Sequence, residues 1–407
     1  MASNIQELKM SANAYQAPMA SRSVVAALLP IMAAVFVAFL VTGLAMPVLP
    51  LHVHDGLGLG TFVVGLVAGC QFTASLLSRF WSGSYADSRG GKRAVVIGLL
   101  LAVASGLFYL LSLRFVGAPV TSAAVLLVGR AVLGGAESFI ITGALSWGLA
   151  LAGPENTGKV MAWVGTAMYV AFAIGAPAGS MLYATYGFAA LALATTLIPL
   201  ITLLLVSSRQ AVVPQTQARR PSFTKVVGAV WVPGVGLAFS SVGFGAITTF
   251  VVLLFSQRGW GLAWLALTVF ATAFVLARVL FSHLADRIGG ARVALVSALI
   301  EAIGLALIWL APWGALALFG ACVTGFGYSL VYPGFGVEAV RRAPAESRGL
   351  AMGAYTAFLD LALGLANPAL GLVAGGLGLS AMFLTSALVV ACSAAVAARL
   401  LIWSVKN

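Results

Sequence analysis

The sequence predicts an all-α polytopic membrane protein whose twelve transmembrane helices form two six-helix bundles related by pseudo-two-fold symmetry. Three observations predict this fold class. Of the 407 residues, 61% are hydrophobic and 8% are charged, and the mean hydropathy of +1.07 lies far above that of soluble globular proteins. The apolar residues gather in long runs. The two halves of the chain repeat one pattern of loops.

The first six apolar runs are each long enough to cross a bilayer, which takes roughly 20 mostly apolar helical residues. They are rich in Ala, Leu and Val and lack the two-residue alternation of a barrel strand, so helices are expected. Residues 1–20 lack the apolar core and cleavage site of a signal peptide, so the first run is expected to be retained. These runs cover residues 24–51, 61–85, 92–113, 120–150, 159–184 and 187–207.

Six further apolar runs follow a polar segment, residues 208–225, which we predict to be a cytoplasmic linker. They have the same composition and lengths as the first six, so they are expected to form the same kind of helix. The predicted domains are an N-terminal bundle at 1–207 and a C-terminal bundle at 226–407. The second set of runs covers residues 226–256, 261–285, 291–311, 314–340, 348–374 and 378–404.

The basic residues are distributed unevenly between the two sides that this topology defines. With both termini in the cytoplasm, seventeen of the 22 Lys and Arg residues lie in cytoplasmic segments, and only Arg114 and Arg258 lie in outer loops. Cytoplasmic loops of membrane proteins carry such an excess. The distribution therefore predicts the orientation, and it explains the net charge of +12 without a nucleic-acid partner.

The two halves of the chain repeat one another in the same direction. A shift of 191 residues aligns Glu155 with Glu346 and Pro177 with Pro368. Parallel repeats of six spans are a recognised transporter architecture, with the substrate site near the middle of the membrane between the halves. A second shift, of 199 residues, aligns Arg79 with Arg278, Asp87 with Asp286, Gly90 with Gly289 and Arg93 with Arg292.

The loops "SGSYADSRGGKR" (82–93) and "FSHLADRIGGAR" (281–292) carry the most prominent of these repeats. Asp87 is expected to meet the positive N-terminal end of the helix that starts near residue 348, and Asp286 the one near residue 158. Such a contact is worth about 0.3 to 2 kcal/mol, enough to bias a gate. The alternative is that the charges only fix topology. The predicted gating residues are Asp87, Arg89, Gly90, Lys92, Arg93, Asp286, Arg287 and Arg292.

These residues resemble the major facilitator superfamily, and in particular its twelve-span drug/proton antiporter-like branch. "GSYADSRGGK" resembles the loop signature G-x-L-A-D-R-x-G-R-K, although Ser88 and Gly91 depart from it. "PVLP" (47–50), "GRAVLGGA" (129–136) and "GAPAGS" (175–180) are similar to motifs of helices 1, 4 and 5. Among subgroups the chain looks closest to a sugar-efflux-permease-like bacterial set. The resemblance implies alternating access by two bundles in the bacterial cytoplasmic (inner) membrane.

Charged residues inside the spans are candidates for function, because each costs at least ~2.5 to 3.5 kcal/mol at a helix centre. Arg130 and Glu137 are seven residues apart, on one face of a helix and roughly 10 Å apart along its axis. We expect them to line the central cavity together, with Glu137 as a proton carrier whose contact with Arg130 alternates. Asp360 is the second candidate for a proton or substrate. Either acid could instead be a structural ion-pair partner.

Three other charged residues lie within predicted spans. Arg79 and Arg278 are expected to pair with carbonyls or lipid phosphates at the inner rim. Glu301 is expected to face a neighbouring helix or to remain protonated in lipid. A structural role is favoured for the two arginines.

The cavity lining is predicted from residue types alone, as apolar surface with a few hydrogen-bonding groups. Each uncharged residue would also fit ordinary packing. The proton-coupling candidates are Glu137, Asp360 and Arg130. The substrate-binding candidates are Arg130, Glu137, Gln71, Tyr169, Phe244, Tyr328, Tyr332, Asp360 and Asn367.

The first functional hypothesis is proton-coupled export of a small organic solute, such as a drug, a sugar or a siderophore-like metabolite. A proton-coupled uptake symporter of the same fold is the alternative. An enzyme or a sensor has less support, because the sequence contains no G-x-x-x-x-G-K-[ST], H-E-x-x-H or G-x-S-x-G motif and only three histidines. We expect no cofactor and no metal, a lipid bilayer and protons as partners, and a monomer.

Overall fold

The computed structural model describes residues 21–153, 157–208, 223–281, 283–343 and 348–406. Every regular element within these ranges is a helix. This confirms the predicted all-helical class, and it follows from lipid, where a backbone must satisfy its own hydrogen bonds. The first bundle consists of α2 (Ser21–Ala45), α3 (Val48–Leu51), the π-helical turn η1 (His52–Gly56), α4 (Thr61–Arg89), α5 (Gly91–Ser112), the 3₁₀ turn η2 (Leu113–Phe115), α6 (Pro119–Ala152) and α7 (Thr157–Ser207).

The long element α7 contains two membrane spans. Its apolar part, Trp163–Ser207, has 45 residues, which would be about 68 Å long as one straight helix. That is more than twice the thickness of the hydrocarbon core. At Gly187 the backbone leaves the helical conformation, with φ at 72°, a value that glycine adopts without strain. The chain turns there, at the first residue of the predicted run 187–207 and three residues after the end of the run 159–184.

The second bundle repeats this arrangement. Among the described residues, eleven helices are long and apolar enough to cross a membrane, and with α7 counted as two spans they supply the twelve predicted spans. The predicted linker, 208–225, falls largely on residues outside the described ranges. The elements of the second bundle are α8 (Phe223–Gln257), α9 (Ala263–Phe281), α10 (Leu284–Ile288), α11 (Gly290–Leu310), α12 (Gly314–Arg342), α13 (Arg348–Leu377) and α14 (Leu379–Lys406).

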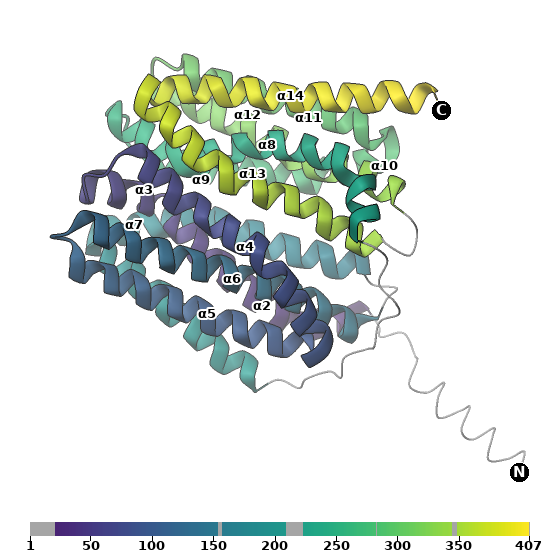
Figure 1. The fold of residues 1–407 in the computed structure, drawn as a ribbon, viewed down its shortest axis with the longest axis horizontal. Coiled ribbons are helices and arrows are strands. Elements are labelled where there is room, and N and C mark those ends of the chain that lie inside the picture. The colour runs from purple at the N-terminus through teal and green to yellow at the C-terminus, as the bar shows by residue number, and fades with distance from the viewer. Residues whose placement is uncertain (1–20, 154–156, 209–222, 282, 344–347, 407) are drawn as a thin grey trace, which may run out of the picture.

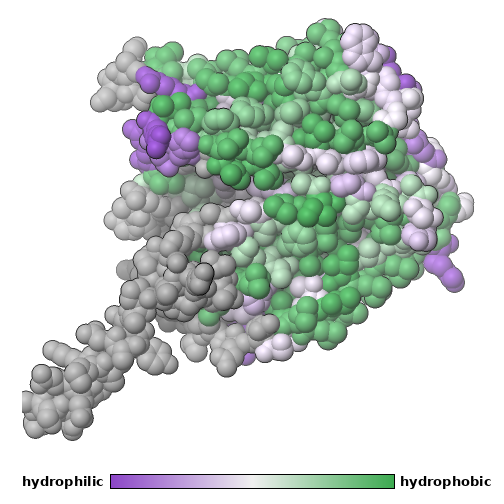
Figure 2. Space-filling model, turned by 180° about the vertical axis from the view of Figure 1, so that it is seen from behind, coloured by the Kyte–Doolittle hydropathy of each residue, from purple (hydrophilic) through white to green (hydrophobic). Residues whose placement is uncertain are grey.

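The two bundles lie side by side, with their helices running along the long axis of the molecule. In Figure 1, α2 to α7 occupy the lower half and α8 to α14 the upper half. We call the right-hand end, where α14 ends and α10 lies, the terminal face, and the left-hand end, where α3 lies, the opposite face. Apolar residues cover the middle of the molecule and hydrophilic residues gather at both ends (Figure 2), as expected for a protein that spans a bilayer.

Among the described residues, the bundles share an apolar core in the half toward the opposite face. There a single cluster combines residues of the first bundle, such as Leu49 and Val67, with residues of the second, such as Phe250 and Phe270. Toward the terminal face the bundles have separate clusters, one around Trp147 and one around Phe335. The molecule is therefore closed by apolar packing at the opposite face.

Small residues let α4 and α13 approach each other closely along the seam between the bundles. A Cβ atom at Gly65 would collide with the backbone of Asn367 and Pro368, and Gly371 lies against Thr61. The Thr61 hydroxyl donates a hydrogen bond to the Gly371 carbonyl, at 2.7 Å. Close approach of this kind is a common way for helices to associate in membranes.

Candidate functional site

An ion pair joins the two bundles across the α4–α13 seam. Arg79 Nη2 of α4 lies 2.5 Å from Asp360 Oδ2 of α13, and Arg79 Nε donates a hydrogen bond to the same oxygen at 2.7 Å. The Arg79 side chain is 25% exposed and that of Asp360 is 6% exposed. Arg79 follows Thr61, the first residue of α4, by eighteen positions, which places it about 27 Å along that helix.

These partners differ from the expectations for both residues. Arg79 was expected to pair with carbonyls or lipid phosphates at the rim, but it reaches inward to a carboxylate of the other bundle. Asp360 was expected to line a central cavity, but its carboxylate is occupied by this guanidinium. The structural alternative for Asp360, an ion-pair partner, is therefore realised in this conformation. A buried carboxylate needs a hydrogen-bonded counter-ion, and the half-buried Arg79 supplies it.

Arg278 of α9 makes the corresponding contact on the other side of the molecule, with aromatic rings in place of a carboxylate. Its guanidinium carbon lies 5.4 Å from the ring centroid of Tyr169 in α7, 5.3 Å from that of Phe274 and 5.8 Å from that of Tyr332. Rings at these distances attract a cation through their electron-rich faces. Arg278, like Arg79, is thus turned toward the other bundle, and its described partners are aromatic rings; the expectation of carbonyl or lipid-phosphate partners stays a prediction for it.

The two arginine contacts occupy equivalent positions in the repeat. The shift of 199 residues aligns Arg79 with Arg278, and the shift of 191 residues aligns Tyr169 with Asp360. In each seam an arginine of one bundle therefore meets the same position of the other bundle. In one seam the partner of the arginine is the Asp360 carboxylate, which loses its charge when it is protonated. In the other seam the partner is the Tyr169 ring, which carries no charge to lose.

Glu137 is buried within the first bundle, where it is 5% exposed. Its Oε1 accepts a hydrogen bond from the Thr42 hydroxyl of α2 at 2.7 Å, and Gln71 of α4 lies beside the carboxyl group. Within the described part of the chain Glu137 has no ion pair with Arg130. Arg130 borders one of the cavities described below, and the prediction that it lines a central cavity together with Glu137 stays a prediction.

Arg130 of α6 is also 5% exposed, yet no carboxylate of the described residues lies within ion-pair distance of it. Its Nε donates to the Val67 carbonyl at 3.3 Å, and its Nη1 lies 3.5 Å from the Tyr109 hydroxyl. Both contacts are long for hydrogen bonds. Arg130 is thus a buried cation whose contacts are all to neutral groups.

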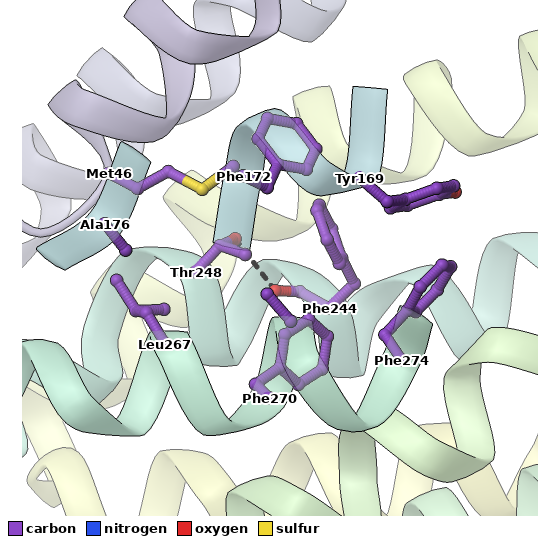
Figure 3. Close-up of a pocket in the computed structure, with 10 residues that line it drawn as sticks. Met46, Tyr169, Phe172, Ala176, Phe244, Thr248, Leu267, Phe270 and Phe274 are labelled. Atoms are coloured by element: carbon purple, nitrogen blue, oxygen red, sulfur yellow. Dashed lines mark hydrogen bonds between the residues drawn. The ribbon is translucent and has the colours of Figure 1, made fainter. Parts of the chain in front are cut away.

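Two small cavities lie between the bundles. The first, which we call the aromatic cavity, has a volume of about 20 Å³ (Figure 3), and α7 and α9 face each other across it. The second, the arginine cavity, has a volume of about 30 Å³. The aromatic cavity is lined by Met46, Tyr169, Phe172, Ala176, Phe244, Thr248, Leu267, Phe270, Ala271 and Phe274, and the arginine cavity by Thr42, Ala45, Met46, Leu49, Pro50, Val64, Val67, Ala68, Phe72, Arg130, Thr248 and Thr249.

The cavities adjoin, because Met46 and Thr248 line both of them. Each has room for one or two water molecules only. A solute of the size that transporters move would need several hundred Å³. Neither of these two cavities therefore has room for such a solute in this conformation.

The remaining predicted lining residues fall into three groups. Tyr169 and Phe244 line the aromatic cavity, and Tyr328 stacks behind Phe244 with ring centroids 5.1 Å apart. Gln71 and Asn367 are fully buried and line neither described cavity. Tyr332 contacts Arg278 and hydrogen-bonds to the Thr356 hydroxyl at 2.9 Å.

Several residues at the site were missed by the sequence analysis. Thr42 and Thr248 carry no signal of their own, because isolated threonines are common in apolar helices. The Tyr169–Asp360 equivalence could have been found, since the shift of 191 residues is present in the sequence. Glu338 of α12 was also missed: it accepts a hydrogen bond from the first turn of α11, at Ala291 N, and pairs with Arg342 at 2.7 Å.

Glu301 of α11 is fully buried and accepts a hydrogen bond from Ser240 of α8. The contact realises one of the two expectations for it, that it faces a neighbouring helix.

The predicted gating loops lie at the terminal face. Asp87 and Asp286 are exposed, and Gly90 and Gly289 have φ values of 94° and 95°, which only glycine adopts readily. Lys92 Nζ donates to the Ser207 carbonyl at 2.8 Å, while Arg89, Arg93, Arg287 and Arg292 are exposed. The expected partners of the two aspartates, near 348 and 158, fall on segments outside those whose side chains are described, so the latch stays a prediction.

The sequence and the fold both match known transporters. An uncharacterized MFS-type transporter of Salmonella typhimurium is 43% identical over 371 residues, which are 91% of this chain and 95% of that protein. The fold is similar to that of the nucleoside transporter NupG, with a TM-score of 0.73 at 15% identity, covering 91% of this chain and 99% of that one. It is also similar to that of a D-xylose-proton symporter, with a TM-score of 0.70 at 14% identity, covering 89% and 96%. Residues 31–268 and 259–406 match the Major Facilitator Superfamily. The chain belongs to this superfamily and is a multi-pass membrane transporter.

Proposed function

We propose that the protein exports a small organic solute across the bacterial cytoplasmic membrane in exchange for protons, as a member of the drug/proton antiporter-like branch. The terminal face lies in the cytoplasm in this proposal, with both termini on that side. The excess of Lys and Arg in the segments of that face supports this orientation. Bacterial relatives of the same superfamily are consistent with it.

The observation that carries the proposal is the ion pair between Arg79 and Asp360. It joins the bundles at a depth where a carboxylate is costly unless it is paired. Protonation of Asp360 removes its negative charge and with it the attraction to the guanidinium. Separation of α4 from α13 then costs less, so proton binding favours movement of the bundles.

Glu137 is a second proton site in this proposal. Its carboxyl group lies within the first bundle and accepts a hydrogen bond from Thr42 of α2. The surroundings of this group therefore depend on how the helices around the cavities pack. Arg130, on the same helix, borders the arginine cavity. Movement of α2 relative to α6 would change the hydrogen bond to Glu137, and in this way couple its proton to the state of the cavity.

The shared core supports alternating access. Apolar packing closes the opposite face, and the cavities between the bundles are too small for a solute. A solute can enter only after one end opens. Separate cores toward the terminal face allow that end to open while the shared core stays packed. The predicted latches at Asp87 and Asp286 would close the terminal face in the other state.

The test is transport in proteoliposomes with an imposed pH gradient, using a panel of drugs, sugars and siderophore-like metabolites. We expect the wild-type protein to move at least one solute against the direction of the protons. The Glu137→Gln and Asp360→Asn variants should insert into the membrane and lose the response to the gradient. Transport by the wild type that is indifferent to the gradient would contradict proton coupling.

A proton-coupled uptake symporter is the second candidate, because the fold is shared with a D-xylose-proton symporter. The same assay separates the two. Accumulation of the solute in the direction of the protons would identify a symporter, and accumulation against it an exporter.

A further inference from the structure

We propose that the transported solute is an aromatic carboxylate, with its carboxylate bound by Arg130 and its ring placed in the aromatic cavity. This inference rests on the proposed function, because it assumes that the space between the bundles is the transport site. It names the substrate class among those that the fold would accept.

Arg130 supplies the first part of the argument. A buried guanidinium with only neutral, long contacts is costly, since charges in protein interiors are normally paired. A guanidinium has five N–H donors, and none of the described residues accepts a hydrogen bond from its Nη2. The side chain borders a cavity, so the counter-ion that it lacks can come from there. A carboxylate is the group that fits its planar fork.

The aromatic cavity supplies the second part. Tyr169 and Phe172 lie on one side of it, and Phe244, Phe270 and Phe274 lie on the other (Figure 3). The rings already pack against one another: Tyr169 and Phe274 have centroids 4.0 Å apart, and Phe244 and Phe270 have centroids 5.9 Å apart. A planar aromatic group can replace such ring contacts when the bundles move apart, because offset and edge-on ring pairs are mutually attractive.

The connection between the cavities supplies the third part. Met46 and Thr248 line both of them, and a methionine side chain is long and flexible enough to move aside. A solute that fills both cavities has an apolar ring at one end and an anionic group at the other.

The same lining disfavours the other solute classes. A sugar needs many hydrogen-bonding partners, but in the aromatic cavity the Thr248 hydroxyl is already donated to the Phe244 carbonyl, at 2.8 Å. A cationic drug would be repelled by Arg130, which has no acidic neighbour within ion-pair distance among the described residues.

The test is equilibrium binding to the purified full-length protein in nanodiscs, at one pH and without a gradient. The probes are 2-naphthoate, which has ring and charge, 2-naphthylmethanol, which has the ring alone, and heptanoate, which has the charge alone. We expect 2-naphthoate to bind at least about tenfold more tightly than either of the others, because each part adds favourable contacts. Equal binding of all three, or none, would overturn the inference.

Variants assign the binding to these residues. Arg130→Gln should weaken 2-naphthoate roughly 30-fold or more, because the bound carboxylate then lacks its partner, and should leave 2-naphthylmethanol unchanged. Arg130→Lys should restore part of the loss, since it keeps the charge without the planar fork. Arg258→Gln is the matched control, because Arg258 is exposed and hydrogen-bonds to Ser380. Unchanged 2-naphthoate binding in Arg130→Gln would overturn the assignment.

If Arg130→Gln does not fold, Phe270→Leu decides instead. It should reduce the preference for 2-naphthoate over heptanoate several-fold, because it removes a ring from the aromatic cavity. An unchanged preference would overturn the inference. Failure of the proposed function looks different: 2-naphthoate would bind as expected, but its movement would ignore a pH gradient. If the protein moved a sugar in response to the gradient and did not bind 2-naphthoate, the proposed substrate class would be overturned, while the proposed proton-coupled transport would stand.

Discussion

Asp360 and Tyr169 occupy equivalent positions in the two bundles and give Arg79 and Arg278 different partners. The carboxylate makes a strong, charge-assisted contact that acid abolishes. The aromatic ring makes a weaker contact that is indifferent to pH. Under the proposed proton coupling, these two residues of the repeat would make one seam between the bundles respond to protons and leave the other seam without a response.

The Arg79–Asp360 pair should show energetic coupling in a double-mutant cycle. Asp360→Asn leaves a half-buried guanidinium without its counter-ion, so the free energy of unfolding should fall. The double variant Arg79→Gln/Asp360→Asn should lose less than the sum of the single variants, with a coupling of about 0.5–3 kcal/mol. Thermal unfolding of the four proteins in one detergent measures it. Additive effects would show that the pair contributes nothing.

The hydrogen bond from Thr42 to Glu137 predicts a contrast between two conservative substitutions. Thr42→Val keeps the shape but removes the donor, leaving a buried carboxyl group unsatisfied, so the protein should lose about 1–3 kcal/mol of stability. Thr42→Ser keeps the hydroxyl and is the matched control. The midpoints of thermal unfolding distinguish them. Equal midpoints for Thr42→Val and Thr42→Ser would contradict a role for this bond.

Hydropathy predicted where the helices begin and end along the chain, but it did not predict which side of each helix faces the other bundle. The break lies at Gly187, the first residue of the predicted run 187–207, because length and apolar composition decide where a span ends. The partner of Arg79 could not be predicted, since apolar residues surround these helices and no polar stripe shows which side faces inward. The sequence position of Arg79 predicted its depth in the membrane. The direction in which its side chain points depends on how the helices pack, which the sequence did not show. The same holds for Arg130 and Glu137, whose depths were expected and whose contacts were not.

The close packing of α4 against α13 should not tolerate a side chain at Gly65. Gly65→Val places carbon atoms against the backbone of Asn367 and Pro368, so closure of the opposite face should weaken by about 1–3 kcal/mol. The expected result is slower transport and faster labelling of cysteines placed in the shared core. Gly83→Val is the matched control on the same helix, because a Cβ atom there meets nothing within 4 Å. Similar behaviour of the two variants would contradict the seam.

At the scale of the whole molecule, the fold was predicted and the conformational state was not. The repeat at shifts of 199 and 191 residues predicted two parallel bundles, since it records their common ancestry in the sequence. States open to either side have the same helices and the same hydropathy pattern. They differ in how the bundles are placed, which depends on side-chain packing between them. Tyr169 and Phe244 could be chosen as lining residues from their type, but the contraction of the space around them could not.

Closure of the opposite face predicts that a disulfide can lock it. A Cβ atom at Gly375 would lie 3.2 Å from the Thr61 Oγ1 atom, close to the distance of about 3 Å between a Cβ and the far sulfur of a disulfide. The Thr61→Cys/Gly375→Cys protein should therefore cross-link on oxidation and stop transporting.

Reduction should restore transport in that protein. Each single-cysteine variant should be unaffected by the oxidant, in a background where Cys70, Cys322 and Cys392 are replaced by serine. Continued transport by the cross-linked protein would contradict opening at this face.

The shared apolar cluster also sets how temperature acts on the working cycle. Opening of the opposite face brings side chains such as Phe250 and Leu253 into contact with water, so the open form has the larger heat capacity. Hydrophobic attraction weakens on cooling. The fraction of molecules that are open at the opposite face should therefore increase on cooling. The van't Hoff plot of the equilibrium constant for this opening should be curved.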